Sequence, residues 1–180
     1  MRALIHSFAY LIDQLNRWVG IGTAFTVLIV TLLAVVTAFG RKFGIGSNAL
    51  IELQWYLFAL IFLLAAAWTL QRDEHLRVDV LAKRWSPQTR AWIDIIGHLL
   101  VLLPLASLLL WLGGKQTLSM YLSGERSPDA GGLIRWPVWA LVPLGFLLLI
   151  LQTLADLSRK LLIVTGSSPS NDHDLPEHQP

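Results

Sequence analysis

The charged and polar side chains inside long apolar segments are the residues of this chain that could do chemistry. Glu52 is the single charged residue in the apolar run 49–70, and a carboxylate inside a membrane-spanning segment can relay a proton or a cation. Glu52 also lies about one helical turn from the start of that run, where it can reach headgroups or loop donors and is favoured by the helix dipole. Both interpretations stay open, a coupling site and a structural contact, and we favour the structural contact.

A second group of polar residues lies in the third and fourth apolar runs. His98 is the one histidine within such a run, and haem held between two membrane helices needs two facing histidines. A single His98 therefore favours a polar contact between helices. Gln152 and Asp156 lie one helical turn apart, and Asp156 can pair with Arg159 or Lys160. We interpret this group as contacts between helices or between subunits.

The sequence has no motif for catalysis or for cofactor binding. It contains no cysteine, which excludes disulfides, iron–sulfur clusters, thiolate metal sites and a cysteine nucleophile. It has no glycine-rich phosphate loop, no HExxH metal motif and no paired carboxylates within an apolar run. We predict that the chain is not an enzyme and binds no metal and no cofactor.

Residues 72–79 form a dense cluster of alternating charge, with the sequence RDEHLRVD. Such a cluster is compatible with an ordinary solvated loop. It is equally compatible with a docking surface for a partner, because charges of mixed sign favour a specific register. The residues alone do not favour one of these two interpretations over the other.

The elements that must position these residues are helices that span a membrane. The chain has 180 residues, 54% of them hydrophobic and only 14% charged, whereas soluble domains have about 25% charged residues. Runs of about 20 residues with almost no charge indicate spanning helices, because backbone polar groups in lipid must be satisfied within the segment. All eight tryptophans lie near the ends of these runs, where lipid headgroups are expected. We predict an all-α integral membrane protein with four transmembrane helices, at about 18–39, 49–70, 92–112 and 137–157.

The distribution of basic residues predicts the orientation. The net charge is +2, and the basic residues gather beside the apolar runs, so we attribute them to contact with membrane lipid rather than with nucleic acid. Lys and Arg are more frequent on the side that holds both termini and the loop between the second and third runs. By the positive-inside rule, both termini are expected in the cytoplasm.

The first residues, 1–17, have an apolar stripe opposite a polar face, which is typical of an amphipathic helix on a membrane surface. Gly20 and Gly22 offer a place to turn from this helix into the first span; the alternative is one helix that extends further into the cytoplasm. We favour the turn, and so expect an interfacial helix at 1–17, a four-helix membrane domain at 18–163 and a disordered tail at 164–180.

Local signals predict how the third helix begins and ends. Ser86 is expected to cap it, with Pro87 in its first turn. Beyond the membrane the helix is expected to continue to residue 122. An ordered turn rich in Gly, Ser and Pro should follow at 123–132.

Several segments, taken in chain order, resemble a known protein family. They are ELQWYLF from Glu52, RDEHLRVDV from Arg72, ERSPDAGGL from Glu125, RWP from Arg135, LVPLGF from Leu141 and LQ from Leu151. Together they resemble the small membrane subunit of tripartite ATP-independent periplasmic (TRAP) transporters, the DctQ-like family, over about residues 13–160.

The resemblance implies a function and a set of partners. Such transporters take up organic acids across the bacterial inner membrane with a sodium gradient. A periplasmic substrate-binding protein delivers the substrate, and a large membrane subunit carries the substrate and sodium sites. The small subunit is expected to pack beside the large subunit and to scaffold it.

The resemblance also assigns contact residues. It implies a cytoplasmic docking role for His75, Arg77 and Asp79, and a periplasmic contact role for Glu125, Ser127 and Trp136. The residues themselves add three more candidate contacts, which are Glu52, Arg72 and Gln152.

Three other functions remain open. The first is a self-contained, cation-coupled small exporter that uses Glu52 as its relay. The second is a membrane anchor of a redox enzyme, and the third is an unrelated assembly or chaperone subunit. The transported substrate cannot be predicted from this chain, because the resemblance places the specificity sites on partner subunits.

Overall fold

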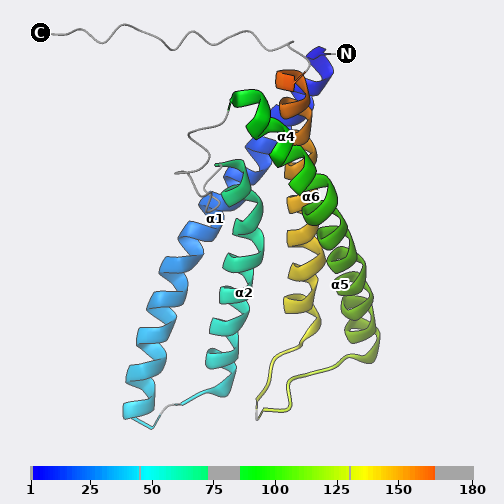
Figure 1. Cartoon of the computed structure of the whole chain (residues 1–180). Helices are drawn as coiled ribbons and strands as arrows, with labels where there is room; N and C mark the ends of the chain where they lie inside the picture. The colour runs from blue at the N-terminus through cyan, green and yellow to red at the C-terminus, as the bar shows by residue number, and fades with distance from the viewer. Residues whose placement is uncertain (1, 45, 73–85, 130, 165–180) are drawn as a thin grey trace, which may run out of the picture.

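The computed structural model describes residues 2–44, 46–72, 86–129 and 131–164, and this part of the chain is almost entirely helical (Figure 1). The helices are α1 (Arg2–Lys42), α2 (Asn48–Gln71), α4 (Pro87–Gly97), the π-helical turn η1 (His98–Leu102), α5 (Leu103–Ser123) and α6 (Trp136–Val164). Four helical segments are long and apolar enough to cross a membrane, with α4, η1 and α5 forming the third. Within the described residues the only strand-like pairing is one isolated bridge. The prediction of an all-α protein with four long apolar helices is confirmed.

The four long segments run antiparallel, so the molecule has two distinct ends (Figure 1). We call them the terminal end, where α1 begins and α6 ends, and the hairpin end, where α1 meets α2 and α5 meets α6. The predicted tail at 164–180 lies outside the described residues apart from Val164. The cluster at 72–79 lies outside them apart from Arg72.

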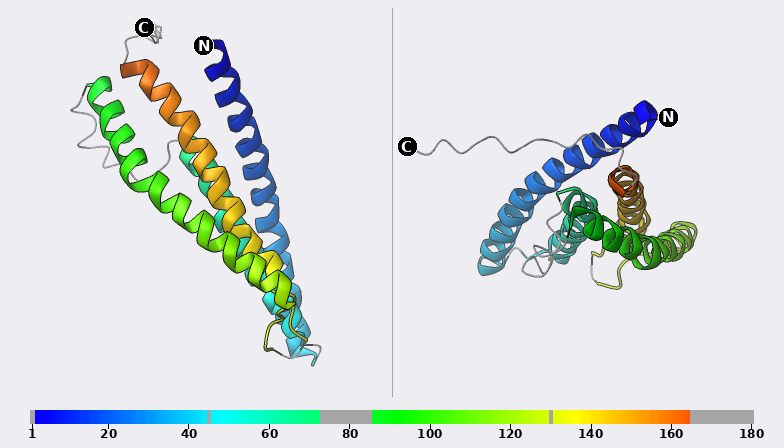
Figure 2. Two further views of the ribbon diagram at one scale, coloured as in Figure 1. Left: turned by 90° about the vertical axis from the view of Figure 1, so that its right-hand side faces the viewer. Right: turned by 45° about the horizontal axis from the view of Figure 1, so that its top comes forward.

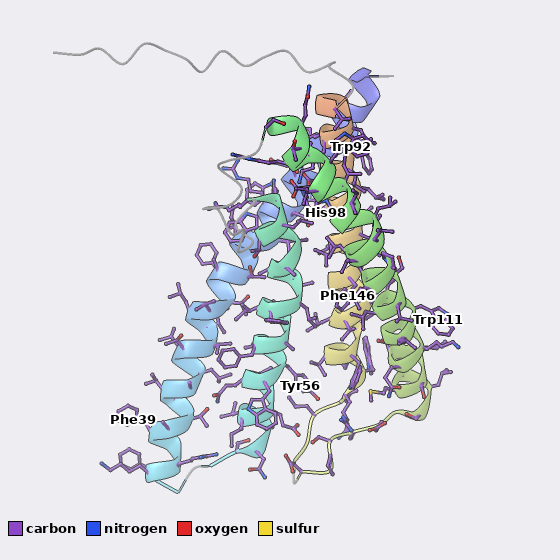
Figure 3. All side chains as sticks on the ribbon, in the orientation of Figure 1. Phe39, Tyr56, Trp92, His98, Trp111 and Phe146 are labelled. Atoms are coloured by element: carbon purple, nitrogen blue, oxygen red, sulfur yellow. The ribbon has the colours of Figure 1, made fainter. Side chains whose placement is uncertain are left out.

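The helices form a row in the order α1, α2, α6, α5 rather than a closed bundle. α2 packs between α1 and α6, and α5 packs against α6. The row twists along its length, so that α1 also contacts α6 at the terminal end (Figure 2). Each helix therefore leaves much of its surface uncovered. Figure 3 shows side chains projecting outward from every helix, and Phe62 of α2 is 80% exposed.

The first helix differs from the prediction. α1 is one uninterrupted helix from Arg2 to Lys42, so the predicted turn at Gly20 and Gly22 is wrong and the alternative of a single long helix describes the structure. Gly20 has a different role, because a Cβ at this position would overlap the indole ring of Trp68 in α2. The glycine lets two helices approach closely, which is a common use of small residues in membrane proteins.

The N-terminal part of α1 packs against α6 through both apolar and polar residues. Ala9 and Ile12 are buried against Ala155 of α6, and Asn16 on the same side has no exposed surface. Of the predicted apolar stripe, Phe8, Leu11 and Leu15 face outward instead, and Leu11 is 65% exposed. This arrangement suits a helix surrounded by lipid, where apolar side chains are well solvated and polar groups must find partners inside the protein.

Pro104 explains the π-helical turn in the third segment. A proline has no N–H to donate to the carbonyl oxygen four residues back, and its ring crowds that carbonyl. Immediately before Pro104, the backbone N–H of Leu103 bonds to the carbonyl oxygen of His98, five residues back. A single turn with this wider spacing accommodates the proline within a continuous membrane helix.

The two predictions about the ends of this segment are confirmed. The Ser86 hydroxyl oxygen accepts a hydrogen bond of 3.2 Å from the backbone N–H of Thr89, and Pro87 occupies the first turn. At the other end the helix continues to Ser123, one residue beyond the expected position. Gly124 then closes it with a φ of 62°, in the left-handed region that favours glycine.

Candidate functional sites at the two ends of the helices

The hairpin end is organised around Glu52, which lies in the second turn of α2 and is 8% exposed. Its Oε2 accepts a hydrogen bond of 2.7 Å from the backbone N–H of Leu133. The carboxylate also accepts a hydrogen bond from the hydroxyl group of Ser127. Both donors belong to the connection between α5 and α6. Glu52 thus fastens this connection to α2, which supports the structural interpretation of the residue.

The connection itself is a short hairpin, residues 124–135, with an antiparallel bridge between Arg126 and Ile134. The backbone N–H of Ser127 donates to the carbonyl oxygen of Leu133 over 3.0 Å. The two groups that donate hydrogen bonds to Glu52, the Ser127 hydroxyl and the Leu133 N–H, therefore lie side by side on the two arms of the hairpin. The ordered turn predicted at 123–132 is confirmed, and the carboxylate holds its two arms together.

An ion pair joins the two arms of the hairpin just before α6 begins. Arg135 Nη1 lies 2.6 Å from Oε1 of Glu125, and the backbone N–H of Arg135 donates to the carbonyl oxygen of Glu125 over 3.1 Å. Both side chains are about two-fifths exposed, so this pair contributes at most about 1 kcal/mol. Trp136, the first residue of α6, makes an edge-to-face contact with Tyr121 of α5, with ring centroids 5.5 Å apart. The structure thus places Glu125, Ser127 and Trp136 in contacts within the chain.

Sequence reasoning missed Tyr56 at this end. Its hydroxyl donates to the carbonyl oxygen of Ile134 over 3.3 Å. Tyr56 lies four residues after Glu52, on the same face of α2, so helical spacing could have indicated it. We call Glu52, Tyr56, Glu125, Ser127, Leu133 and Arg135 the hairpin cluster.

The terminal end contains a buried polar network centred on Gln152 of α6, which has no exposed surface. Its Oε1 accepts a hydrogen bond of 2.7 Å from Nδ2 of Asn16. Its Nε2 donates to Oδ1 of Asp13 over 2.9 Å. The structure therefore places the candidate Gln152 between two helices of the same chain.

Asp13 connects this network to the remaining helices. Nη1 of Arg159 in α6 lies 2.5 Å from Oδ2 of Asp13, and Nε2 of Gln71 in α2 donates to the backbone oxygen of Asp13 over 3.1 Å. One acidic residue thereby joins α1, α2 and α6. We call Asp13, Asn16, Gln71, Gln152 and Arg159 the terminal cluster.

A second set of charges binds α4 and η1 to α6. Nζ of Lys160 lies 2.8 Å from Oδ2 of Asp94 and 2.7 Å from Oδ2 of Asp156. The predicted pairing of Asp156 with Lys160 is confirmed. Nδ1 of His98 lies 3.4 Å from Oδ2 of Asp156, which agrees with the expected polar contact between helices.

The predicted docking cluster is described only at its first residue. Arg72 lies over the ring of Trp68, 4.4 Å from its centroid, and a cation in this position is attracted by the aromatic face. His75, Arg77 and Asp79 lie outside the described residues, so their roles stay predictions.

The polar groups at both ends therefore hold helices and a hairpin in fixed positions. The described residues contain no group of three or more side chains able to hold a metal ion. The surface between the two clusters is apolar and largely uncovered.

Comparison with known protein families agrees with this description. The model of the family described as "Tripartite ATP-independent periplasmic transporters, DctQ component" matches residues 27–162, which is most of the chain. This chain belongs to the DctQ family. No curated protein and no solved structure matches it.

Membership of the DctQ family makes the chain a multi-pass membrane component of a TRAP transporter. The match covers the hairpin cluster completely, but it begins after Asp13 and Asn16 of the terminal cluster. DctQ is a family of transporter components and not of enzymes. A component of a tripartite transporter works with other subunits.

Proposed function

We propose that this DctQ chain is the small membrane subunit that scaffolds the large TRAP subunit during sodium-driven uptake of an organic acid. In this proposal the chain lies in the bacterial inner membrane with the terminal end in the cytoplasm. The hairpin end then faces the periplasm, where a substrate-binding protein delivers the substrate. The large subunit holds the substrate and sodium sites.

The open row of helices is the observation that carries this proposal. In a closed four-helix bundle each helix buries one side against the others, whereas here α1 and α5 lie at opposite edges of the row. Interfaces between membrane helices depend on shape and on van der Waals packing, because lipid is as apolar as leucine. A broad, rigid and uncovered apolar surface suits a subunit whose task is to support a larger neighbour.

The two polar clusters support the rigid role. Asp13 joins three helices at the terminal end, and Glu52 fixes the hairpin to α2 at the other end. Both clusters restrain movements between helices, as a scaffold requires.

The same contacts weigh against a self-contained exporter. A coupling carboxylate must release its partners to take up and hand on a proton or a cation. Glu52 is occupied by two donors of the hairpin, and membrane transporters usually place ion sites where a helix is broken near the midplane. Glu52 lies instead in the second turn of α2, close to its end.

The contact residues follow from this orientation. On the cytoplasmic side we propose that Arg72, His75, Arg77 and Asp79 dock against the large subunit. On the periplasmic side the hairpin is the proposed contact for the large subunit or for the binding protein. Its candidate residues Glu125 and Ser127 hold its shape, and Trp136 anchors the start of α6.

Replacing Arg77 by Ala tests the cytoplasmic part of the proposal. Loss of a docking charge is expected to lower the amount of this chain that co-purifies with the tagged large subunit, while the amount of the chain in the membrane stays the same. Arg84→Ala is the matched control, because it removes the same charge from the same loop but lies outside the resembling segment. Equal co-purification and equal uptake for the two variants would refute the docking role of Arg77.

A further inference from the structure

We propose that the hairpin end carries a binding site for the phosphate headgroup of a phospholipid. The site is a cavity of about 450 Å³ whose lining includes Tyr56 of α2, Arg126, Gly131 and Ile134 of the hairpin, and Pro137 of α6. Sites for small ligands have volumes of about 300–1,000 Å³, so the cavity has room for a headgroup.

Arg126 provides the positive charge of this cavity. Along the hairpin, side chains alternate between two faces, so Arg126 and its bridge partner Ile134 lie opposite the pair of Glu125 and Arg135. Arg135 is neutralised by Glu125. Among the described residues no acidic side chain forms an ion pair with Arg126, which is exposed. A guanidinium without an acidic partner matches a phosphate group, which it can bind through two parallel hydrogen bonds.

The rest of the lining favours a lipid over an acidic side chain of a protein partner. Ile134 and Pro137 supply apolar surface, and Gly131 exposes backbone without a side chain. Tyr56 brings its ring to the cavity, and Figure 3 shows it on the side of α2 that faces the hairpin. Its neighbour Trp55 is 70% exposed. Tyrosine and tryptophan near the end of a membrane helix mark the headgroup level of the bilayer. A cavity with one cation and an apolar wall at this level matches a phospholipid headgroup and its glycerol backbone.

The inference requires only that the helices span a bilayer. It does not depend on the large subunit or on the transported substrate, so its test is separate from the test of the proposed function.

Native mass spectrometry of the full chain in mild detergent tests the site. The delipidated protein is titrated with phosphatidylglycerol, and the Kd of the first bound lipid is measured. Arg126→Gln is expected to raise this Kd about tenfold, which corresponds to about 1.4 kcal/mol. Lys42→Gln removes the same charge at the same end, from a residue that does not line the cavity, and should change the Kd less than twofold. Arg126→Lys keeps the charge without the planar fork and should give an intermediate Kd.

Three results would overturn the inference. Equal Kd values for Arg126→Gln and Lys42→Gln would mean that lipid binds only as an unspecific shell. Displacement of the lipid by millimolar inorganic phosphate would assign the site to free phosphate instead. Unchanged lipid binding by Arg126→Gln, together with lower co-purification of the large subunit, would make the cavity a protein contact. Circular dichroism and thermal unfolding like those of the unmodified chain would show that each variant is folded.

Discussion

Replacing Gln152 by Leu removes the centre of the terminal cluster while nearly preserving side-chain volume. The change eliminates the hydrogen bonds from Asn16 and to Asp13, and hydrogen bonds between membrane helices contribute about 0.6 kcal/mol each on average. It also leaves the Asn16 amide group buried without this acceptor, which costs about 1–3 kcal/mol. The free energy of unfolding is therefore expected to fall by about 2–4 kcal/mol.

The loss of stability in Gln152→Leu should appear first as local opening of the contact between α1 and α6. Ala9 is 4% exposed in that contact, and the chain contains no cysteine, so Ala9→Cys provides a single probe of local opening. A loss of about 2 kcal/mol raises the opening equilibrium by about 30-fold. We expect maleimide to label the probe slowly in the otherwise unmodified chain and at least tenfold faster when Gln152→Leu is added.

Gln116→Leu is the control for this experiment, because it is the same substitution at an exposed position, in α5. It should leave both the unfolding free energy and the labelling rate nearly unchanged. If Gln152→Leu behaves like Gln116→Leu in both measurements, the terminal cluster does not hold α1 and the reasoning is refuted.

Two further predictions concern the close contact of α1 with α2 and the anchoring of the hairpin. Gly20→Ala should destabilise the protein by about 1–3 kcal/mol through overpacking against Trp68, whereas Gly22→Ala, with open space around it, should be neutral or stabilise by up to about 1 kcal/mol. If unfolding experiments in detergent show that Gly20→Ala and Gly22→Ala change the free energy of unfolding in the same direction, the close contact of Gly20 with Trp68 is contradicted. Glu52→Ala should speed hydrogen exchange of the Leu133 amide, because that amide loses its acceptor, and Glu52→Gln should preserve protection through its remaining oxygen. Equal exchange in all three proteins would argue against the anchor.

Much of the architecture follows from local sequence properties. Long apolar runs predict the four helices because a backbone in lipid has few other ways to satisfy its polar groups. The Ser86 cap and the ordered turn at 123–132 were also predictable, because capping and turn chemistry depend on a few neighbouring residues. The continuity of α1 was not. A glycine can mark either a bend or a close contact, and the contact of Gly20 is with Trp68, which is remote in sequence.

The candidate sites show the same division. Glu52 was recognisable as an unusual residue, and its position near the helix end favoured a structural role. Its partner Leu133 donates a backbone N–H, which carries no side-chain signal, and lies 81 residues away. Asp13 and Asn16 lie in the segment 1–17 that we predicted as an amphipathic helix on the membrane surface. The amphipathic pattern does not reveal whether the polar side of such a helix faces water or another helix. The pairing of Asn16 with Gln152 spans 136 residues and depends on the packing of the first helix against the last.

Uptake of a radiolabelled organic acid into proteoliposomes tests the central claim most directly. Three preparations are compared in a sodium gradient with the substrate-binding protein outside: this chain alone, the large subunit alone, and the two subunits together. We predict no uptake by this chain alone and the highest uptake by the two together. Sodium-dependent uptake by this chain alone, abolished by Glu52→Gln at equal protein level, would contradict the account and establish the chain as a transporter in its own right.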